Sequence, residues 1–381
     1  MRGESGERRR GQRDFVSRSG IPGAFGRFLA PGAWLRRLCL LLLLNIVAFA
    51  LSAGPGRAQQ ESYRVYLSFI TGGGSPSSVS TGEQSPAPPS PSPTPQPPLP
   101  AWLEYVNAVR AQAGLPPVVE NRAWSDGAAK HARYMVKNDY VGHDEDPANP
   151  WFTPEGRDAG RAGNVLVSSN GEMSAEEAID MWMQGPFHAL GLLDPALRET
   201  GFGLYREEIG VRHFGATIDV LRGRKGVPAE VTFPVMWPGD GATVALTSYV
   251  GNEFPDPLSP CPGYQAPTGL PVVVQFGGGT GTPRVEAHAF RRGNVALEHC
   301  VFDETSYTNE SPEMEWWGRN LLNARDAVIL VPRDPLEPGS TYTVSLTVNG
   351  ATYTWSFTVE GRARRASSST NVLLRTLLPS P

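Results

Sequence analysis

Apolar residues recur at helical spacing in three segments of this 381-residue chain. In the first segment, Trp102, Val106 and Val109 repeat at intervals of three or four residues, which places their side chains on one face of a helix. The last segment opens with the capping box Ser174-Ala-Glu-Glu177 and stops at Gly185-Pro186. The pattern therefore predicts helices over residues 102–113, 122–138 and 174–184.

The pattern changes to short strands after residue 200. GFGLYRE (201–207) and RHFGATIDV (212–220) each read as a strand. Beyond residue 226, apolar or alternating runs are separated by Gly, Pro and Asn, and Asn349-Gly350 has the sequence of a type I′ hairpin turn. Strands at this spacing, mostly without helices between them, predict a β-sandwich. Residues 140–172 show neither pattern, so we predict a long irregular stretch there.

The first hundred residues carry export and spacer signals. Arg36 and Arg37 precede the apolar run LCLLLLLNIVAFALSA, which is slightly shorter than the roughly 20 residues that span a bilayer. We predict a signal peptide with a long basic n-region over residues 1–58, and an uncleaved anchor is the alternative. Residues 59–100 are rich in Pro and Ser and are predicted to form an extended linker.

The charge balance argues against nucleic acid as a ligand. The chain has 34 Lys and Arg and 38 Asp and Glu, a net charge of −4. Removal of residues 1–58 takes away ten Arg and three acidic residues, a net of +7, which leaves about −11. An acidic protein without a stripe of basic residues is a poor candidate for binding nucleic acids or anionic lipid headgroups. We expect no nucleic-acid partner, and membrane contact only through the N-terminal segment if it is uncleaved.

Three cysteines are too few for a disulfide scaffold. Cys39 lies inside the apolar run of the predicted signal, so Cys261 and Cys300 remain after cleavage. Because exported proteins meet an oxidising environment, we expect these two to form a disulfide.

Five motifs within residues 101–222 give the chain a family resemblance. They are YVNAVRAQAGLPPV, ARYMVKNDYVGH, AGNV, AIDMWMQGPFHALGLLDP and ETGFG. In this order they resemble the CAP superfamily, the SCP-like fold of cysteine-rich secretory proteins, and most of all its bacterial secreted branch. Asn107 and Arg110 fit the N-x-x-R helix of that branch, His143 fits the next histidine, His188 the Gly-His turn, and Glu199–Gly203 the final E-[IV]-G-x-G element.

The resemblance implies an α-β-α sandwich with a cleft that, in many members, holds two His and two Glu able to bind a divalent metal. His143 and His188 match the two histidines, and the two glutamate positions carry Gly163 and Gly185. We therefore expect a cleft that retains both imidazoles and has lost both carboxylates.

A metal would need replacement ligands, because zinc takes three or four protein ligands at about 2.0–2.2 Å. Glu199 is one candidate, and the acidic residues Asp144, Glu145 and Asp146 next to His143 are others, although acidic loop residues are more often simply solvated. No cofactor is firmly indicated, and the one that the resemblance allows is a divalent metal such as zinc, held by His143 and His188. We take the candidate ligand cleft to be His143, His188 and Glu199.

No motif of nucleophilic hydrolysis is present in the sequence. It contains no G-x-S-x-G, H-E-x-x-H or S-x-x-K segment. An imidazole could act as a general base, but it would lack a carboxylate to fix its tautomer. We assign no catalytic residue.

The other histidines and one aromatic pair are expected to be structural. His131 lies on the apolar face of its helix, His288 and His299 lie among strands, and His213 begins a strand that could reach the cleft. Trp316-Trp317 lies in a Glu-rich segment that we predict to be a loop, and packing against the sandwich is favoured over stacking on a sugar.

The predicted fold class is α+β: an α-β-α SCP-like sandwich over residues 101–225, an all-β Ig-like sandwich over 226–360, and a flexible tail over 361–381. The function we favour is non-enzymatic binding of a lipid, cell-wall or protein ligand by a secreted or cell-surface protein. Two alternatives stay open, a metal-dependent hydrolase acting through His143 and His188, and a structural or adhesion protein of the cell surface.

Overall fold

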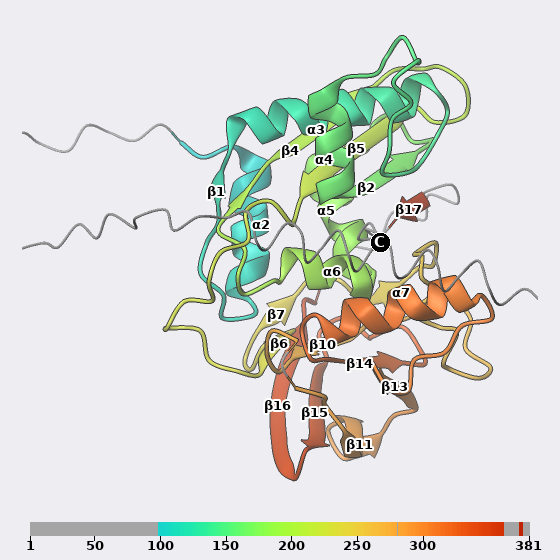
Figure 1. Ribbon diagram of the computed structural model, residues 1–381. Coiled ribbons are helices and arrows are strands. Elements are labelled where there is room, and N and C mark those ends of the chain that lie inside the picture. Colours follow the sequence, from blue (N-terminus) through green and yellow to red (C-terminus); the bar gives the residue numbers. More distant parts are fainter. Residues whose placement is uncertain (1–97, 280, 362–372, 376–381) are drawn as a thin grey trace, which may run out of the picture. The chain divides into compact units, whose positions relative to one another are not determined.

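The computed structural model describes residues 98–279, 281–361 and 373–375 (Figure 1). The predicted signal peptide, nearly all of the predicted linker and most of the predicted tail lie outside these residues. Within them, no helix is both long enough and apolar enough to cross a membrane.

The first half of the described chain is built on a four-stranded sheet in the order β17-β2-β5-β4. All neighbouring strands in it are antiparallel. Its outer strand β17 comes from the predicted tail and pairs with β2, so the chain returns to this sheet after completing the β-sandwich. The strands are β2 (Gly163–Ser168), β4 (Phe202–Arg206), β5 (Phe214–Asp219) and β17 (Leu373–Arg375).

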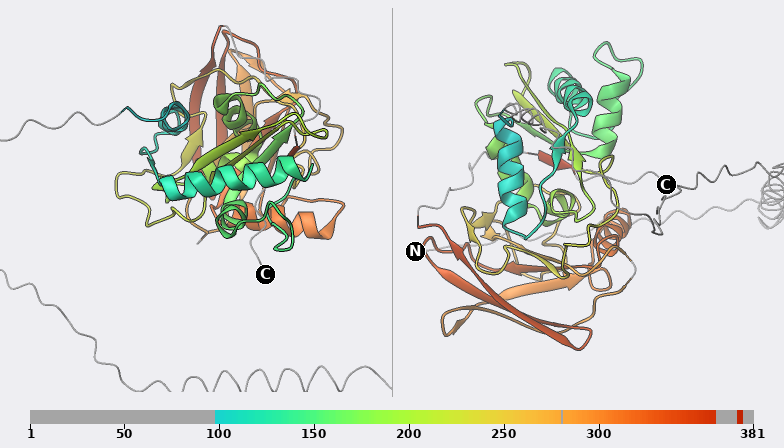
Figure 2. Two further views of the ribbon diagram at one scale, coloured as in Figure 1. Left: turned by 90° about the horizontal axis from the view of Figure 1, so that it is seen from above. Right: turned by 90° about the vertical axis from the view of Figure 1, so that its left-hand side faces the viewer.

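Helices cover both faces of this sheet (Figures 1 and 2). On one face lie α3 (Arg122–Lys137) and α4 (Pro154–Ala162). On the other lie α2 (Ala101–Ala111) and α5 (Ala175–Gln184), where the rings of Trp102 and Trp182 meet Phe202 of β4 with centroids 5.4 and 6.3 Å apart. This is the α-β-α sandwich expected from the sequence.

The ETGFG motif has a packing role in this sandwich. Successive residues of a strand face opposite sides of the sheet, so Phe202 faces α2 and α5 while Gly203 faces α3. A Cβ at Gly203 would lie 2.1 Å from the backbone nitrogen of Ala129 in α3. Glycine is therefore required for the close approach of helix and strand.

The three predicted helices are present, and the predicted capping box of Ser174 and Glu177 is formed. The irregular stretch predicted for 140–172 is wrong in part, because it contains α4 and the whole of β2. Helix α4 begins with the Thr153 cap and Pro154, but its sequence PEGRDAGRA has no apolar periodicity to reveal it. The segment after α5, read as a turn, is the short helix α6 (Pro186–Leu192).

The second half forms two sheets that share one hydrophobic core, a β-sandwich (Figure 2). One sheet has the order β13-β14-β10-β6, and the other has the order β12-β11-β15-β16-β7. Along β15, buried residues alternate with more exposed ones, as expected for a strand with one face toward a core. The strands are β6 (Val235–Trp237), β7 (Thr243–Val244), β10 (Val272–Gln275), β11 (Val285–Arg292), β12 (Val295–Ala296), β13 (His299–Asp303), β14 (Ala327–Pro332), β15 (Thr341–Val348) and β16 (Ala351–Val359).

Two local predictions in the sandwich are confirmed. The β15–β16 hairpin turns at Asn349 and Gly350, whose φ values of 51° and 78° fit the type I′ turn. Cys261 and Cys300 form a disulfide with an S–S distance of 2.06 Å.

A helix interrupts the all-β pattern. Trp316 and Trp317 lie in α7 (Pro312–Asn323) and not in a loop, because Ser311 caps a helix that begins with Pro312. Trp317 is buried, whereas Trp316 is 51% exposed, so packing accounts for one ring of the pair and not the other.

Short two-stranded pairs complete the fold. β1 runs parallel to β3, and β8 runs antiparallel to β9. Their bounds are β1 (Val119–Glu120), β3 (Glu199–Thr200), β8 (Ser248–Tyr249) and β9 (Thr268–Gly269).

The α-β-α sandwich and the β-sandwich are joined by buried contacts. Arg325, which precedes β14, forms an ion pair of 3.0 Å with Asp194 after α6. Gln275 of β10 donates a hydrogen bond of 2.9 Å to the carbonyl of Leu193. Core residues of both sandwiches belong to one hydrophobic cluster, so the two parts are packed together and not held by a linker alone.

Candidate functional site

His188 is completely buried in α6, at the junction with the β-sandwich. Its backbone nitrogen donates a hydrogen bond of 2.8 Å to Glu253 Oε1, and its Nδ1 lies 2.6 Å from the same oxygen. Its carbonyl accepts a hydrogen bond of 3.0 Å from the amide of Asn164. The partner of this histidine is thus a carboxylate from the segment after β8, far along the chain from the motifs that the sequence analysis used.

Glu253 occupies the space next to Gly185. A Cβ at Gly185 would lie 2.7 Å from Glu253 Oε1 and 2.8 Å from Glu253 Cδ. By the resemblance, Gly185 is a position where other members carry glutamate. The small residue there leaves room for a carboxylate that comes from the β-sandwich.

Burial controls the electrostatics of the Glu253 carboxyl, because its side chain has no exposed surface. Desolvation raises the pKa of Glu253, although the hydrogen bond from His188 opposes this shift. The hydroxyl of Tyr249 accepts a hydrogen bond of 3.3 Å from the Glu253 backbone nitrogen and fixes the same segment.

His143, the other candidate histidine, lies in the segment between α3 and α4 and is half-buried. Its Nδ1 lies 2.8 Å from the carbonyl of Gly160 in α4, so this nitrogen is the donor. His143 and His188 therefore have different partners in the structure, a backbone carbonyl and a carboxylate respectively.

The acidic residues next to His143 are engaged elsewhere. Asp144 pairs with Arg161 at 2.7 Å, which lowers the pKa of that carboxyl. Glu145 is buried and accepts from Nδ1 of His131 at 2.9 Å, while Nε2 of His131 lies 2.9 Å from the carbonyl of Gly142. Both ring nitrogens of His131 are therefore engaged, one by a carboxylate and one by a backbone carbonyl. His131 is an interior residue, as expected, and Glu145 forms its hydrogen bond with His131 and not with His143.

Glu199 is also paired away from the histidines. Its carboxylate contacts Lys225 Nζ at 2.5 Å and the amide of Asn121 at 3.5 Å, and these contacts lower its pKa. Gly163, the other position where a glutamate is expected, has no space for a side chain, because a Cβ there would lie 2.8 Å from the carbonyl oxygens of Ala159 and Ile218.

The N-x-x-R motif holds the chain around α6. Arg110 is buried, and its guanidinium donates to the carbonyls of Leu192 at 2.7 Å and Asp194 at 3.1 Å. Burial lowers the pKa of Arg110 to about 10, although Asp194 opposes this. Asn107 both donates to and accepts from the backbone of Val118. Both motif residues therefore have structural roles.

In the described ranges, no group of three or more His, Cys, Asp or Glu side chains is placed to hold a metal ion. His213 precedes β5, and its Nε2 lies 3.3 Å from the carbonyl of Gly210 in its own loop.

Comparison with known proteins identifies one segment of the chain, residues 103–214. The family model described as "CAP: Cysteine-rich secretory protein family" matches residues 103–214. This segment is a CAP domain. A solved structure of an extracellular protein containing a SCP domain from Bacillus anthracis str. Ames is 18% identical, and the match covers 32% of this chain and 39% of that chain with a TM-score of 0.24. The comparison with curated proteins gave no match.

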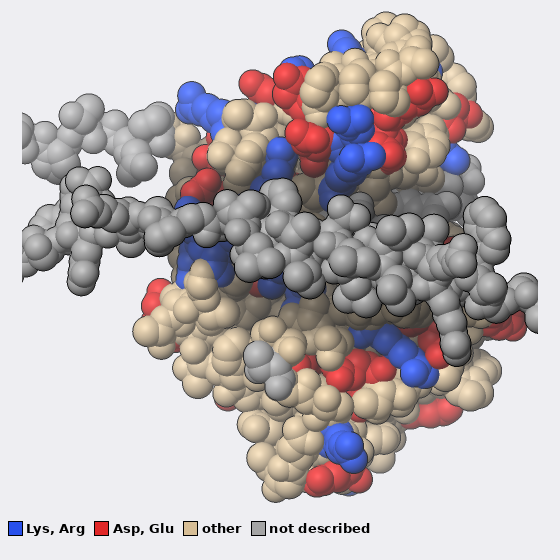
Figure 3. Space-filling view, viewed as in Figure 1, with Lys and Arg blue, Asp and Glu red and all other residues tan. Residues whose placement is uncertain are grey.

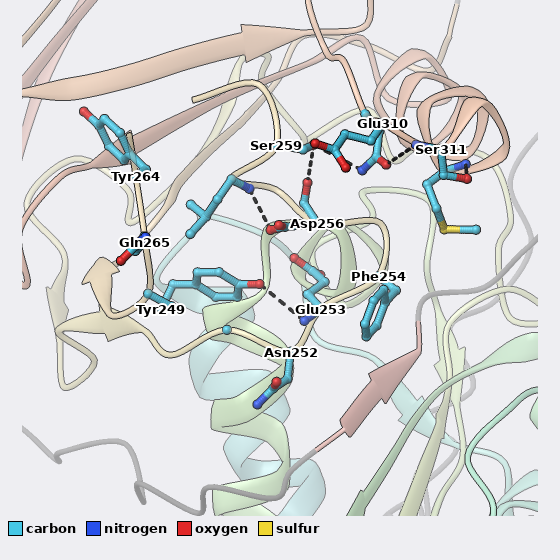
Figure 4. Close-up of a pocket in the computed structure, with 15 residues that line it drawn as sticks. Tyr249, Asn252, Glu253, Phe254, Asp256, Ser259, Tyr264, Gln265, Glu310 and Ser311 are labelled. Carbon is cyan, nitrogen blue, oxygen red and sulfur yellow. Dashed lines mark hydrogen bonds between the residues drawn. The ribbon is translucent and has the colours of Figure 1, made fainter. Parts of the chain in front are cut away.

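The β-sandwich adds a pocket next to the CAP domain (Figure 4). It has a volume of about 820 Å³ and is formed by the segment after β8 and the segment that leads into α7. We call it the Tyr249 pocket. Aromatic rings, amides, hydroxyls and carboxylates line it, and none of these described lining residues is Lys or Arg. Its polar and aromatic lining comprises Tyr249, Asn252, Glu253, Phe254, Asp256, Ser259, Tyr264, Gln265, Asn309, Glu310 and Ser311.

Glu253 links this pocket to His188. Its segment borders the Tyr249 pocket, while its buried carboxylate accepts the hydrogen bonds from His188. Burial raises the pKa of Asp256, the next carboxyl of the pocket, as well. Sequence reasoning missed Glu253 because the segment VGNEFPDP has neither periodicity nor a family motif to mark it.

Proposed function

We propose that this chain is a non-enzymatic extracellular binding protein in which the CAP domain supports a ligand pocket of the adjoining β-sandwich. The observation that carries the proposal is the contrast between the two candidate sites. His188 has no exposed side-chain surface and is bonded to Glu253, whereas the Tyr249 pocket is a hollow of about 820 Å³. A pocket of this size is in the range of small-molecule sites.

The lining of the pocket favours a hydrophilic ligand. The exposed ring of Phe254 and the half-buried ring of Tyr264 offer faces to a ligand, and amides and carboxylates lie beside them. An acyl chain would leave those polar groups without partners, which is costly. A saccharide presents apolar C–H faces for the rings and hydroxyls for the amides and carboxylates. Of the ligand classes expected from the sequence, a cell-wall saccharide therefore fits better than a lipid.

The burial of His188 disfavours the alternative of a metal-dependent hydrolase. A general base must come within about 3 Å of the proton that it removes. His188 could reach a substrate only if the contact with the β-sandwich opened, because Glu253 and α6 enclose it.

The extracellular location is part of the proposal. It is supported by the predicted signal over residues 1–58 and by the Cys261–Cys300 disulfide, since disulfides persist in oxidising compartments. The charges on the surface agree with a ligand other than nucleic acid, because Lys and Arg are interspersed with Asp and Glu on the face shown in Figure 3.

The test is titration calorimetry of the exported chain, residues 59–381, with the N-acetylglucosamine trimer as a probe of wall glycan. We expect binding that Tyr264→Ala weakens at least tenfold. The matched control is Trp316→Ala, an exposed ring of α7 that does not line the pocket. Binding lost in Trp316→Ala and retained in Tyr264→Ala would place the sugar elsewhere and contradict the proposal, as would the absence of binding to the wild type.

A further inference from the structure

Two histidines of the β-sandwich that lie 11 positions apart along the chain are in direct contact. His288 is on β11 and His299 begins β13. The distance from His288 Nδ1 to His299 Nε2 is 2.8 Å, and the two ring centroids are 4.9 Å apart at an angle of 84° between the planes. These residues belong to neither the CAP histidines nor the Tyr249 pocket.

The hydrogen bonding of His299 determines which of its ring nitrogens has a lone pair to offer to a ligand. Its Nδ1 lies 2.7 Å from the carbonyl of Leu297, which can only accept, so Nδ1 carries the hydrogen. In the neutral imidazole the lone pair is then on Nε2, and this nitrogen faces His288. A backbone carbonyl that orients the second nitrogen in this way is the usual arrangement behind a metal-binding histidine.

The position of the pair leaves it accessible. His288 is exposed and His299 is half-buried, with its ring near the buried ring of Phe290 at a centroid distance of 6.1 Å. His288 also borders a hollow of about 280 Å³. The pair therefore combines a partly buried ring held by a backbone carbonyl with an exposed ring at the edge of a hollow.

We propose that His288 Nδ1 and His299 Nε2 together bind a transition-metal ion of the Ni²⁺ and Cu²⁺ type, with water at the remaining positions. The ion takes the place of the hydrogen on His288 Nδ1, and His288 then carries its one N–H on Nε2 as the other neutral tautomer. Imidazole ligands suit these metals, whereas Mg²⁺ and Ca²⁺ take oxygen ligands. The proposal does not depend on the proposed saccharide binding.

The spacing of the nitrogens favours some ions over others. Two nitrogens about 2.0–2.1 Å from a metal lie about 2.9 Å apart at a right angle, as in square-planar or octahedral sites, and about 3.3 Å apart at the tetrahedral angle of zinc. The observed 2.8 Å is the length of the hydrogen bond between the two nitrogens and lies nearer the first value, and the exposed His288 ring must turn for both lone pairs to meet at an ion. We therefore expect Ni²⁺ to bind more tightly than Zn²⁺.

The experiment is calorimetric titration of residues 59–381 with Ni²⁺, Zn²⁺ and Mg²⁺ as separate probes. We expect one Ni²⁺ per chain, weaker Zn²⁺ binding and no Mg²⁺ binding. His288→Ala and His299→Ala should each weaken Ni²⁺ binding at least tenfold. The matched control, His213→Ala, removes a histidine outside the pair and should leave the affinity unchanged.

Folding is checked on the same samples by thermal unfolding. Because His299 is half-buried, the exposed variant His288→Gln provides a second test that keeps the fold. Ni²⁺ affinity that is unchanged in His288→Gln, or lost equally in His213→Ala, would overturn the proposal. So would a wild type that binds no Ni²⁺.

Discussion

The contact between Glu253 and His188 gives a quantitative prediction for Glu253→Ala. The substitution removes the oxygen that accepts from both the backbone nitrogen and Nδ1 of His188, at 2.8 and 2.6 Å. Removing one partner of a buried pair costs about 3–5 kcal/mol. An orphaned buried donor accounts for about 1–3 kcal/mol of this, and the remainder comes from the space that the side chain leaves.

The assay is urea unfolding and thermal unfolding of residues 59–381, followed by circular dichroism. At about 2–4 °C per kcal/mol, the expected loss lowers the Tm by about 6–20 °C. Glu310→Ala is the matched control, because Glu310 lines the same pocket and is exposed, and it should change stability by less than about 0.5 kcal/mol. If Glu253→Ala costs less than 1 kcal/mol, or no more than the control, Glu253 does not hold the two sandwiches together.

Three further substitutions test neighbouring features. Gly185→Ala places a Cβ 2.7 Å from Glu253 Oε1 and should cost about 1–3 kcal/mol in urea unfolding; a neutral result would show that the carboxylate moves aside freely. Replacing Cys261 and Cys300 by serine opens the loop between them, and the chain-entropy relation gives a loss of about 4 kcal/mol, to be compared with the reduced wild type as a control. Because burial raises the pKa of Glu253, its contribution to stability is full below the ordinary glutamate value and is lost as the pH rises through the folded value. Glu253→Gln, which mimics the protonated form, should therefore match the wild type near the ordinary glutamate pKa and become the more stable of the two as the pH rises in unfolding titrations. A wild type that gains stability relative to Glu253→Gln with rising pH would contradict the sign of the shift.

The sequence predicted the fold where local signals agree with the tertiary structure. Periodicity located α2, α3 and α5, and the Asn349-Gly350 turn located the β15–β16 hairpin. Periodicity did not reveal α4. Its nine residues are stabilised by the Thr153 cap and by contacts with α3, and not by an apolar stripe of its own.

The candidate site was predictable only in part. The family motifs led to His188 and to the missing glutamate at Gly185, but the carboxylate that fills the space comes from residue 253. A pairing between residues 65 positions apart leaves no trace in periodicity or spacing. The contact of His288 with His299 could not be predicted either, because it depends on which strands of the sandwich lie side by side.

The role of the N-x-x-R motif also needed the structure. Arg110 is fully buried and bonds only to backbone carbonyls among the contacts described for it. An arginine in a helix is usually solvated, so burial of this one could not be read from residue type. Its function is to fix the chain that carries His188.

The central claim is that the ligand enters the Tyr249 pocket and not the site of the CAP histidines. Hydrogen–deuterium exchange of residues 59–381, with and without saturating N-acetylglucosamine trimer, tests it most directly. We predict slower exchange in peptides covering 249–266 and 309–314, which line the pocket, and no change around His143. Protection confined to peptides around His143 and His188 would contradict the account and return the function to the CAP cleft.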